Sequence, residues 1–127
     1  MKLKVLVVED IIALNQNIVD MLEMEGYIAY GVTDMDGAKK VFLSEKPHII
    51  LLDIMLPDGS GYELIPFFRK NHDSFILMLT ALDDNESKRI CYDSGSDDYI
   101  TKPFDLYELI YKIRAIKRRI ISSMREY

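Results

Sequence analysis

The chain has 127 residues, of which 49% are hydrophobic and 29% charged, a composition typical of one globular domain with a packed core. This length is too short for a second domain, and the apolar content excludes intrinsic disorder. The apolar runs fall far short of the roughly 20 residues that cross a bilayer, and no signal-peptide cleavage pattern follows the first of them, so we expect a cytoplasmic protein without membrane contact.

The net charge of −5 is unevenly distributed along the chain. Residues 1–111 carry a net charge of −10, whereas residues 112–127 carry +5. The basic end fits contact with nucleic acid or an acidic partner as well as it fits a solvated helix terminus. The acidic remainder argues against DNA binding by the domain itself. The only cysteine, Cys91, excludes an intramolecular disulfide, and we expect a half-buried helix thiol there.

The hydrophobic pattern predicts five strands, each followed by a helix. The expected strands cover residues 3–8, 27–32, 48–54, 75–80 and 98–101. The expected helices cover residues 11–25, 35–46, about 60–71, 83–94 and a final segment from Asp105. The first strand is a continuous apolar run, as in a central parallel strand with both faces covered, and the second is shorter and fits an edge. Five such units are too few for a closed barrel, so we expect an open, doubly wound parallel sheet.

Residues with special backbone preferences mark the expected element ends. Gly26 would end the first helix in a left-handed turn, and Thr33 or Asp34 would cap the second. Residues 56–61 form a dense turn segment after the third strand. The third helix tolerates Pro66 only in its first turn or at a kink.

Polar side chains follow four of the five predicted strands. They are Glu9 and Asp10 after the first strand, Asp53 after the third, Thr80 after the fourth and Lys102 after the fifth. Open parallel sheets bind ligands at this edge. Three clustered carboxylates need a cation, and oxygen ligands favour Mg²⁺ or Mn²⁺ over zinc. A metal, an ammonium and a hydroxyl around a carboxylate are what phosphoryl transfer to that carboxylate requires.

At these positions the sequence resembles the response regulator receiver domain of two-component signalling, over essentially its whole length. The motifs that carry the resemblance are Val-Val-Glu9-Asp10, Leu-Leu-Asp53-Ile-Met-Leu-Pro-Asp-Gly-Ser-Gly, Leu-Thr80-Ala81 and Gly95-Ser-Asp-Asp-Tyr99-Ile-Thr-Lys102-Pro103-Phe. The resemblance implies an α/β, flavodoxin-like, doubly wound (βα)5 fold with a five-stranded parallel sheet in the order 2-1-3-4-5. It also implies a cis bond before Pro103. The sequence departs from the family pattern at His48, Ser96 and Pro66.

The resemblance implies that Asp53 accepts a phosphoryl group from a sensor histidine kinase. The Mg²⁺ ligands, with Mn²⁺ as an alternative ion, would be Asp10, Asp53, the backbone carbonyl of Met55 and, through a water, Glu9. The protein would then catalyse only its own phosphorylation and dephosphorylation, and it would not be an enzyme acting on a separate substrate.

Further roles follow from the same resemblance. Thr80 and Lys102 would hold the phosphoryl oxygens, and Tyr99 would be the switch aromatic. Met55 and Leu82 lie two residues past Asp53 and Thr80. Because both are apolar and hold no water for hydrolysis, we expect slow loss of the phosphoryl group.

Charged residues on the last helices and strand resemble the OmpR/PhoB-type subfamily, in which they pair across a homodimer formed on phosphorylation. They are Lys88, Asp97, Asp98, Glu108, Lys112 and Arg119. We therefore expect a receiver domain over residues 1–122 and the start of a linker over residues 123–127. DNA would be contacted only through a C-terminal effector domain absent from this chain. A stand-alone receiver that signals by protein contact is the alternative.

Two other functions share parts of this pattern. A haloacid-dehalogenase-like phosphohydrolase needs a second Asp two residues after the nucleophile, where this chain has Met55. A flavodoxin-like FMN carrier needs a phosphate loop after the first strand, where Glu9 and Asp10 would repel a phosphate. Each site residue alone also fits an ordinary structural role, such as a helix cap or a solvated surface charge.

Overall fold

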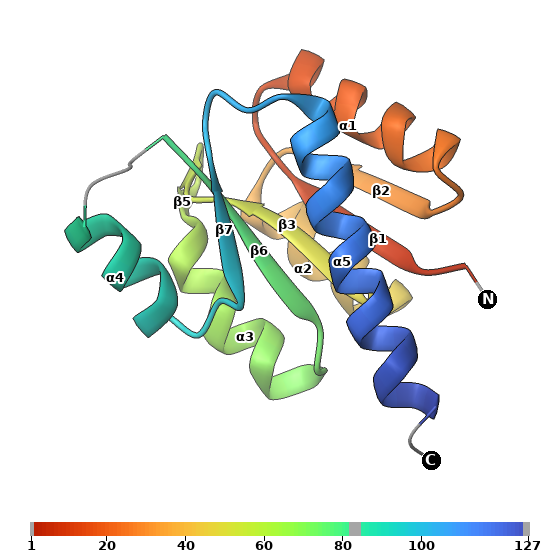
Figure 1. Cartoon of the computed structure of the whole chain (residues 1–127). Coiled ribbons are helices and arrows are strands. Elements are labelled where there is room, and N and C mark those ends of the chain that lie inside the picture. The colour runs from red at the N-terminus through yellow and green to blue at the C-terminus, as the bar shows by residue number, and fades with distance from the viewer. Residues whose placement is uncertain (1, 82–84, 126–127) are drawn as a thin grey trace.

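Five parallel strands form the central sheet in the order β2-β1-β3-β6-β7, in a computed structural model that describes residues 2–81 and 85–125 (Figure 1). The strands are β1 (Lys4–Val8), β2 (Ile28–Val32), β3 (Ile49–Asp53), β6 (Phe75–Thr80) and β7 (Asp98–Thr101). The helices are α1 (Ile12–Met24), α2 (Met35–Glu45), α3 (Leu64–Asn71), α4 (Asn85–Asp93) and α5 (Leu106–Arg125). Since β6 and β7 are the fourth and fifth strands of this sheet, its order matches the predicted order 2-1-3-4-5. The predicted fold class, strand number and strand order are confirmed.

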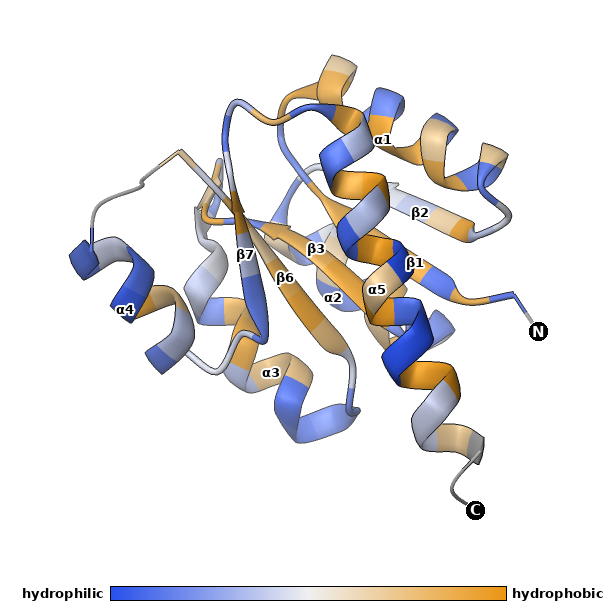
Figure 2. Cartoon of the chain, viewed as in Figure 1, coloured by the Kyte–Doolittle hydropathy of each residue, from blue (hydrophilic) through white to orange (hydrophobic). Residues whose placement is uncertain are grey.

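Helices cover both faces of this sheet, α1 and α5 on one side and α2, α3 and α4 on the other (Figure 1). Successive residues of a strand point to opposite faces. In β3, Leu51 therefore belongs to the same buried cluster as Ile113 of α5, whereas Leu52 belongs to the cluster on the opposite face, with Phe42 of α2 and Phe68 of α3. The interior strands are apolar except at their ends, where Lys4 begins β1, Asp53 ends β3 and Thr80 ends β6, because both of their faces are buried (Figure 2).

The helix ends mostly follow the sequence signals. Gly26 has a φ of +93°, and the Asp34 side chain accepts a hydrogen bond of 2.7 Å from the backbone N–H of Gly37 at the start of α2. Pro66 is the third residue of α3, so its missing N–H lies within the first turn. α5 extends to Arg125, and the expected boundary between residues 122 and 123 falls inside this helix.

No helix among the described residues is long and apolar enough to span a membrane.

The helix α4 differs from the expectation in what it buries. Cys91 is 1% exposed, not half-buried, and its Sγ lies 3.3 Å from the hydroxyl oxygen of Tyr62. Ile90 and Tyr92, the other apolar residues of this helix, are both exposed. The predicted start of the helix at Asp83 lies outside the described residues. Among the described residues of α4, Cys91 alone is buried.

The segment after β3 contains more structure than the turn signals predict. A short antiparallel hairpin, β4 (Met55–Leu56) with β5 (Gly59–Ser60), precedes a 3-10 turn, η1 (Gly61–Glu63), and α3 begins only at Leu64. The backbone N–H of Gly61 donates to the carbonyl of Ile54 at 2.6 Å, so the chain folds back tightly against the end of β3. The helical segment expected from about residue 60 therefore begins as a 3-10 turn at Gly61 and becomes α-helical at Leu64.

Candidate functional site

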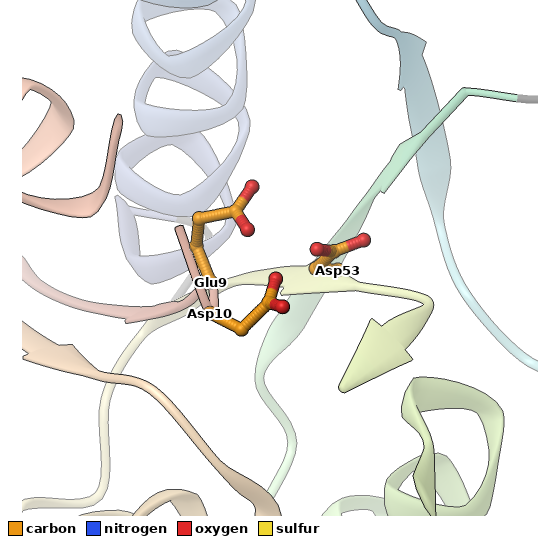
Figure 3. Close-up of side chains that lie close together, drawn as sticks. All are labelled: Glu9, Asp10 and Asp53. Atoms are coloured by element: carbon orange, nitrogen blue, oxygen red, sulfur yellow. The ribbon is translucent and has the colours of Figure 1, made fainter. Parts of the chain in front are cut away.

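Three carboxylates gather at the carboxyl edge of the sheet (Figure 3). Glu9 and Asp10 directly follow β1, and Asp53 ends the neighbouring strand β3. One oxygen of each side chain lies within 4.8 Å of the others. Glu9 and Asp53 are buried, whereas Asp10 is exposed. The site therefore has a buried acidic floor that opens to solvent at Asp10.

Lys102 extends into this cluster from the end of β7. Its Nζ donates to Oδ2 of Asp53 at 3.2 Å and to Oε1 of Glu9. Its backbone N–H donates to the carbonyl of Thr80 at 2.6 Å, which holds the start of the β7–α5 loop against the end of β6. The bond to Pro103 is cis, which confirms the expectation from the sequence. The structure thus brings the predicted ammonium into contact with two of the three predicted carboxylates.

The charges of this cluster do not cancel within the chain. Burial, opposed by the hydrogen bond from Lys102, raises the pKa of Glu9 to about 7. Burial lowers the pKa of Lys102, but the hydrogen bond to Glu9 and the charge of Asp53 outweigh burial and raise it above the ordinary lysine value. One ammonium faces three carboxylates, so the site retains a net negative charge that a cation would neutralise.

The donor set fits a hard divalent cation. All three side chains offer carboxylate oxygens, the ligands that Mg²⁺ and Mn²⁺ prefer. The backbone of Met55 lies beside them, because its N–H donates to Oδ1 of Asp53 at 3.2 Å. Within residues 2–81 and 85–125, no second group of three or more acidic, histidine or cysteine side chains is placed to hold a metal.

Two residues that the sequence interpretation missed support the carboxylates. The side-chain amide of Asn15 donates to the carbonyl of Glu9 at 3.0 Å and to that of Val32 at 2.8 Å, tying α1 to the ends of β1 and β2. A side chain at Gly61 would place its Cβ 2.1 Å from the carbonyl oxygen of Asp53. A polar residue within the buried stripe of α1 is the signal that points to Asn15.

Thr80 and Tyr99 occupy different surroundings. Thr80 is buried at the end of β6 and pairs in register with Thr101 of β7. Tyr99 is half-buried on β7, and its ring meets that of Tyr92 on α4 edge to face, with 5.5 Å between the centroids. The predicted switch tyrosine therefore lies against α4 and not among the carboxylates.

The residues expected at a dimer surface divide into two groups. Lys112 of α5 pairs with Asp98 of β7 at 3.2 Å on the α4–β7–α5 side. Asp97 pairs with Arg69 of α3 at 2.7 Å and accepts a hydrogen bond of 2.8 Å from the N–H of Ile76, so its Oδ2 is already engaged within the chain. The others lie on α4 and α5, namely Lys88, Glu108 and Arg119. Leu82, the second residue expected to shield the site, lies outside the described residues.

Comparison with known proteins connects this geometry to one family. The family model for the response regulator receiver domain matches residues 5–114 of the chain. A two-component response regulator from Clostridium difficile superposes with a TM-score of 0.89 at 29% sequence identity, covering 94% of this chain and 98% of that one. The receiver domain of the Francisella response regulator 1452 has a TM-score of 0.87 at 33% identity, covering 94% of this chain and 99% of that one.

A longer protein is also similar. The response regulator DrrB of Thermotoga maritima, described as an OmpR/PhoB homologue, superposes with a TM-score of 0.83 at 29% identity. The match covers 94% of this chain and 54% of that one. The similarity therefore extends over nearly all of this chain in each comparison.

Proposed function

This chain belongs to the response regulator receiver domain family, and we propose that it accepts a phosphoryl group on Asp53 from a sensor histidine kinase. The observation that carries the proposal is the way both oxygens of this carboxylate are held. Lys102 contacts Oδ2 and the N–H of Met55 contacts Oδ1, both at 3.2 Å. A nucleophile fixed in this way, beside the exposed Asp10, needs little reorientation before it attacks a phosphorus atom.

In the proposed reaction, one carboxylate oxygen of Asp53 bonds to phosphorus while the bond from phosphorus to the donor nitrogen breaks. The donor leaves with the electron pair. The chain supplies position and positive charge for this exchange. Lys102 would neutralise charge on the phosphoryl oxygens, and the hydroxyl of Thr80 would donate to one of them. The protein thereby catalyses its own phosphorylation and dephosphorylation and acts on no separate substrate.

The acidic residues would hold Mg²⁺, or Mn²⁺ in its place. Asp10, Asp53 and the backbone carbonyl of Met55 would be direct ligands, and Glu9 would act through a water. When bound, the ion would balance the charge of the carboxylates and of the incoming phosphoryl oxygens. The surplus of three carboxylates over one ammonium supports this part of the proposal.

Intact-mass measurement after treatment with a small acyl phosphate tests the proposal. With Mg²⁺ we expect one added phosphate, and with EDTA almost none. Asp53→Asn should abolish the addition, whereas Asp20→Asn, a matched change at an exposed position of α1, should leave it unchanged. An Asp53→Asn protein that gained phosphate at the wild-type rate would contradict the assignment.

We further propose that phosphorylation alters the α4–β7–α5 surface and tightens a homodimer there. Thr80 would respond to the phosphoryl group and Tyr99 to the shift of α4. Support comes from the weak anchoring of α4, whose one buried side chain among the described residues is Cys91. A helix held by so little apolar contact shifts at low cost in free energy.

The proposed output is transcription control in the cytoplasm through a DNA-binding effector domain of the OmpR/PhoB type. The similarity to DrrB, described as an OmpR/PhoB homologue, supports this output, as do the charged side chains on β7 and α5. Signalling by a stand-alone receiver through protein contact is the second candidate. A homodimer that forms on phosphorylation favours the first candidate, and a phosphorylated monomer favours the second.

A further inference from the structure

We infer that Asp58 is a positioning residue for the phosphoacceptor site, because it ties the first turn of α2 to the β4–β5 hairpin that carries Met55. Asp58 lies five residues beyond Asp53 and touches none of the three carboxylates in the structure. The inference rests on the proposed function, since it concerns how that site is held.

The contacts between Asp58 and α2 are direct. The backbone N–H of Met35 donates to Oδ1 of Asp58 at 2.9 Å and to Oδ2 at 3.1 Å, and the N–H of Asp36 donates to Oδ2 at 3.4 Å. The bond from Met35 holds the pKa of Asp58 below its usual range, so the carboxylate remains charged at neutral pH. The orphan N–H groups at the start of α2 are thus satisfied by a residue from a different part of the chain.

The hairpin transmits this contact to the phosphoacceptor. Asp58 sits in the turn, followed directly by Gly59, which pairs with Leu56, while Ser60 pairs with Met55. A Cβ at Gly59 would lie 2.6 Å from Sδ of Met35, so the tip of the hairpin packs closely on α2.

The base of the hairpin is fixed at Asp53 itself. The N–H of Met55 donates to Oδ1 of Asp53 at 3.2 Å, and the N–H of Gly61 donates to the carbonyl of Ile54 at 2.6 Å. The hairpin is therefore held at its tip by Asp58 and at its base by Asp53. Loss of the tip contact would free the backbone of Met55, which we have proposed as a metal ligand.

Simple helix capping does not account for Asp58. α2 already has a side-chain cap in Asp34, whose Oδ1 accepts a 2.7 Å hydrogen bond from the N–H of Gly37. Asp34 precedes α2 directly and contributes no hydrogen bond to the hairpin. The two aspartates therefore stabilise the same helix end, but only Asp58 links it to the site. This difference provides a matched control.

The test compares Asp58→Ala, Asp58→Asn and Asp34→Ala in the full chain. Isothermal titration calorimetry measures Mg²⁺ affinity, and intact-mass kinetics with an acyl phosphate measure phosphorylation at each Mg²⁺ concentration. For Asp58→Ala we expect Mg²⁺ affinity to fall about tenfold, as when a residue supporting a metal ligand is removed. Saturating Mg²⁺ should restore most of the phosphorylation rate. Asp58→Asn, which keeps an acceptor for Met35, should lose less affinity than Asp58→Ala.

Asp34→Ala should lower the thermal midpoint as much as Asp58→Ala does, yet leave Mg²⁺ affinity within about twofold of wild type, since a helix cap alone carries no such link. The amide NMR signal of Met55 should shift in the Asp58 variants and stay in place in Asp34→Ala. Equal Mg²⁺ affinity in Asp58→Ala and Asp34→Ala would reduce Asp58 to a helix cap and overturn the inference.

The outcomes for the wild type separate the inference from the proposed function. A wild-type chain that binds Mg²⁺ but gains no phosphate would refute the proposed function, and the Mg²⁺ affinities would still decide the role of Asp58. A wild-type chain that binds no Mg²⁺ would overturn the metal site and this inference together. If Asp58→Ala fails to fold, Asp58→Asn decides, with wild-type affinity and an unshifted Met55 signal counting against the inference.

Discussion

His48 links the start of β1 to β3 by a hydrogen bond that depends on protonation. The imidazole Nδ1 of His48 accepts a hydrogen bond from the backbone N–H of Lys4 at 3.0 Å. The backbone N–H of His48 donates to the carbonyl of Lys4 at 2.9 Å. Burial, with smaller effects from the charges of His72 and Lys4, holds the pKa of His48 below its usual range. Only the neutral imidazole can accept at Nδ1, so protonation breaks this contact.

We predict that the stabilisation from His48 is complete above pH 6.5 and declines as the pH falls below that value. The unfolded chain then binds a proton at His48 that the folded chain resists, which lowers the free energy of unfolding. Urea unfolding in excess Mg²⁺ should show this decline in the wild type and in His72→Asn. The decline should be smaller in His48→Asn, and an equal decline in all three proteins would contradict the role of His48.

Met55 sits at the mouth of the site, with a side chain that is 77% exposed. It offers no polar atom that could orient a water for attack on an aspartyl phosphate, and Leu82 likewise offers none. We predict that Met55→Asn/Leu82→Glu loses the phosphoryl group at least several-fold faster than the wild type, because positioned groups speed hydrolysis. Phosphate loss after removal of the donor measures this rate. A double variant as slow as the wild type would show that these positions do not set the lifetime.

Among the elements, the 3-10 turn η1 that follows the hairpin begins at a small residue, Gly61, which lies against the end of β3. The Cβ of an alanine at position 61 would lie 2.1 Å from the carbonyl oxygen of Asp53, which forces the backbone to move. We predict that Gly61→Ala lowers the free energy of unfolding by about 1–3 kcal/mol, as overpacking does, and slows phosphorylation. The neighbouring Ser60→Ala loses only the 3.3 Å hydrogen bond that the Ser60 hydroxyl accepts from the N–H of Tyr62, so it should cost less than Gly61→Ala and leave the backbone at Asp53 in place. Chemical denaturation checks the first effect and intact-mass kinetics check the second.

The strands and the site residues at their ends could be predicted from the sequence for a simple reason. Continuous apolar runs identify strands buried on both faces, and parallel strands bring their carboxyl ends to one edge. Glu9, Asp53 and Lys102 therefore lie together at this edge, whatever paths the loops between the elements take. The positions of the apolar runs along the sequence were therefore sufficient to predict that these three residues lie together.

The supporting contacts could not be predicted in the same way, because they join distant segments. Asn15 bonds to the carbonyl of Val32, and Asp58 bonds to the N–H of Met35. The residues after β3 carried turn signals, but the signals did not specify a hairpin against α2. The burial of Cys91 was underestimated because its contact with Tyr62 likewise depends on tertiary packing.

At the scale of the whole molecule, we predict that phosphorylation shifts the monomer–dimer equilibrium toward the dimer. Exposed ion pairs across a dimer surface contribute only about 0.2–1 kcal/mol each, so the dimer should need several of them and weaken with salt. Lys112 and Asp98 already pair with each other within the chain at 3.2 Å. Sedimentation velocity of the free and acyl-phosphate-treated protein tests this over micromolar concentrations. Unchanged self-association would count against the dimer surface.

A matched pair of variants separates the two groups of expected dimer residues. Glu108→Gln removes an exposed charge on α5 and should weaken the phosphorylated dimer without loss of monomer stability. Asp97→Asn should destabilise the monomer, because Arg69 and the N–H of Ile76 both depend on that carboxylate. If Glu108→Gln leaves the dimer unchanged, Glu108 does not contribute to the dimer surface.

Identification of the modified residue tests the central claim most directly. After acyl phosphate and Mg²⁺, borohydride reduction converts an aspartyl phosphate to homoserine, and peptide sequencing by mass spectrometry locates it. We predict homoserine at position 53 alone, with its yield strongly reduced in EDTA and in Lys102→Met, which removes the ammonium 3.2 Å from Oδ2 of Asp53. Conversion at position 10, or a full yield at position 53 in both EDTA and Lys102→Met, would contradict the account.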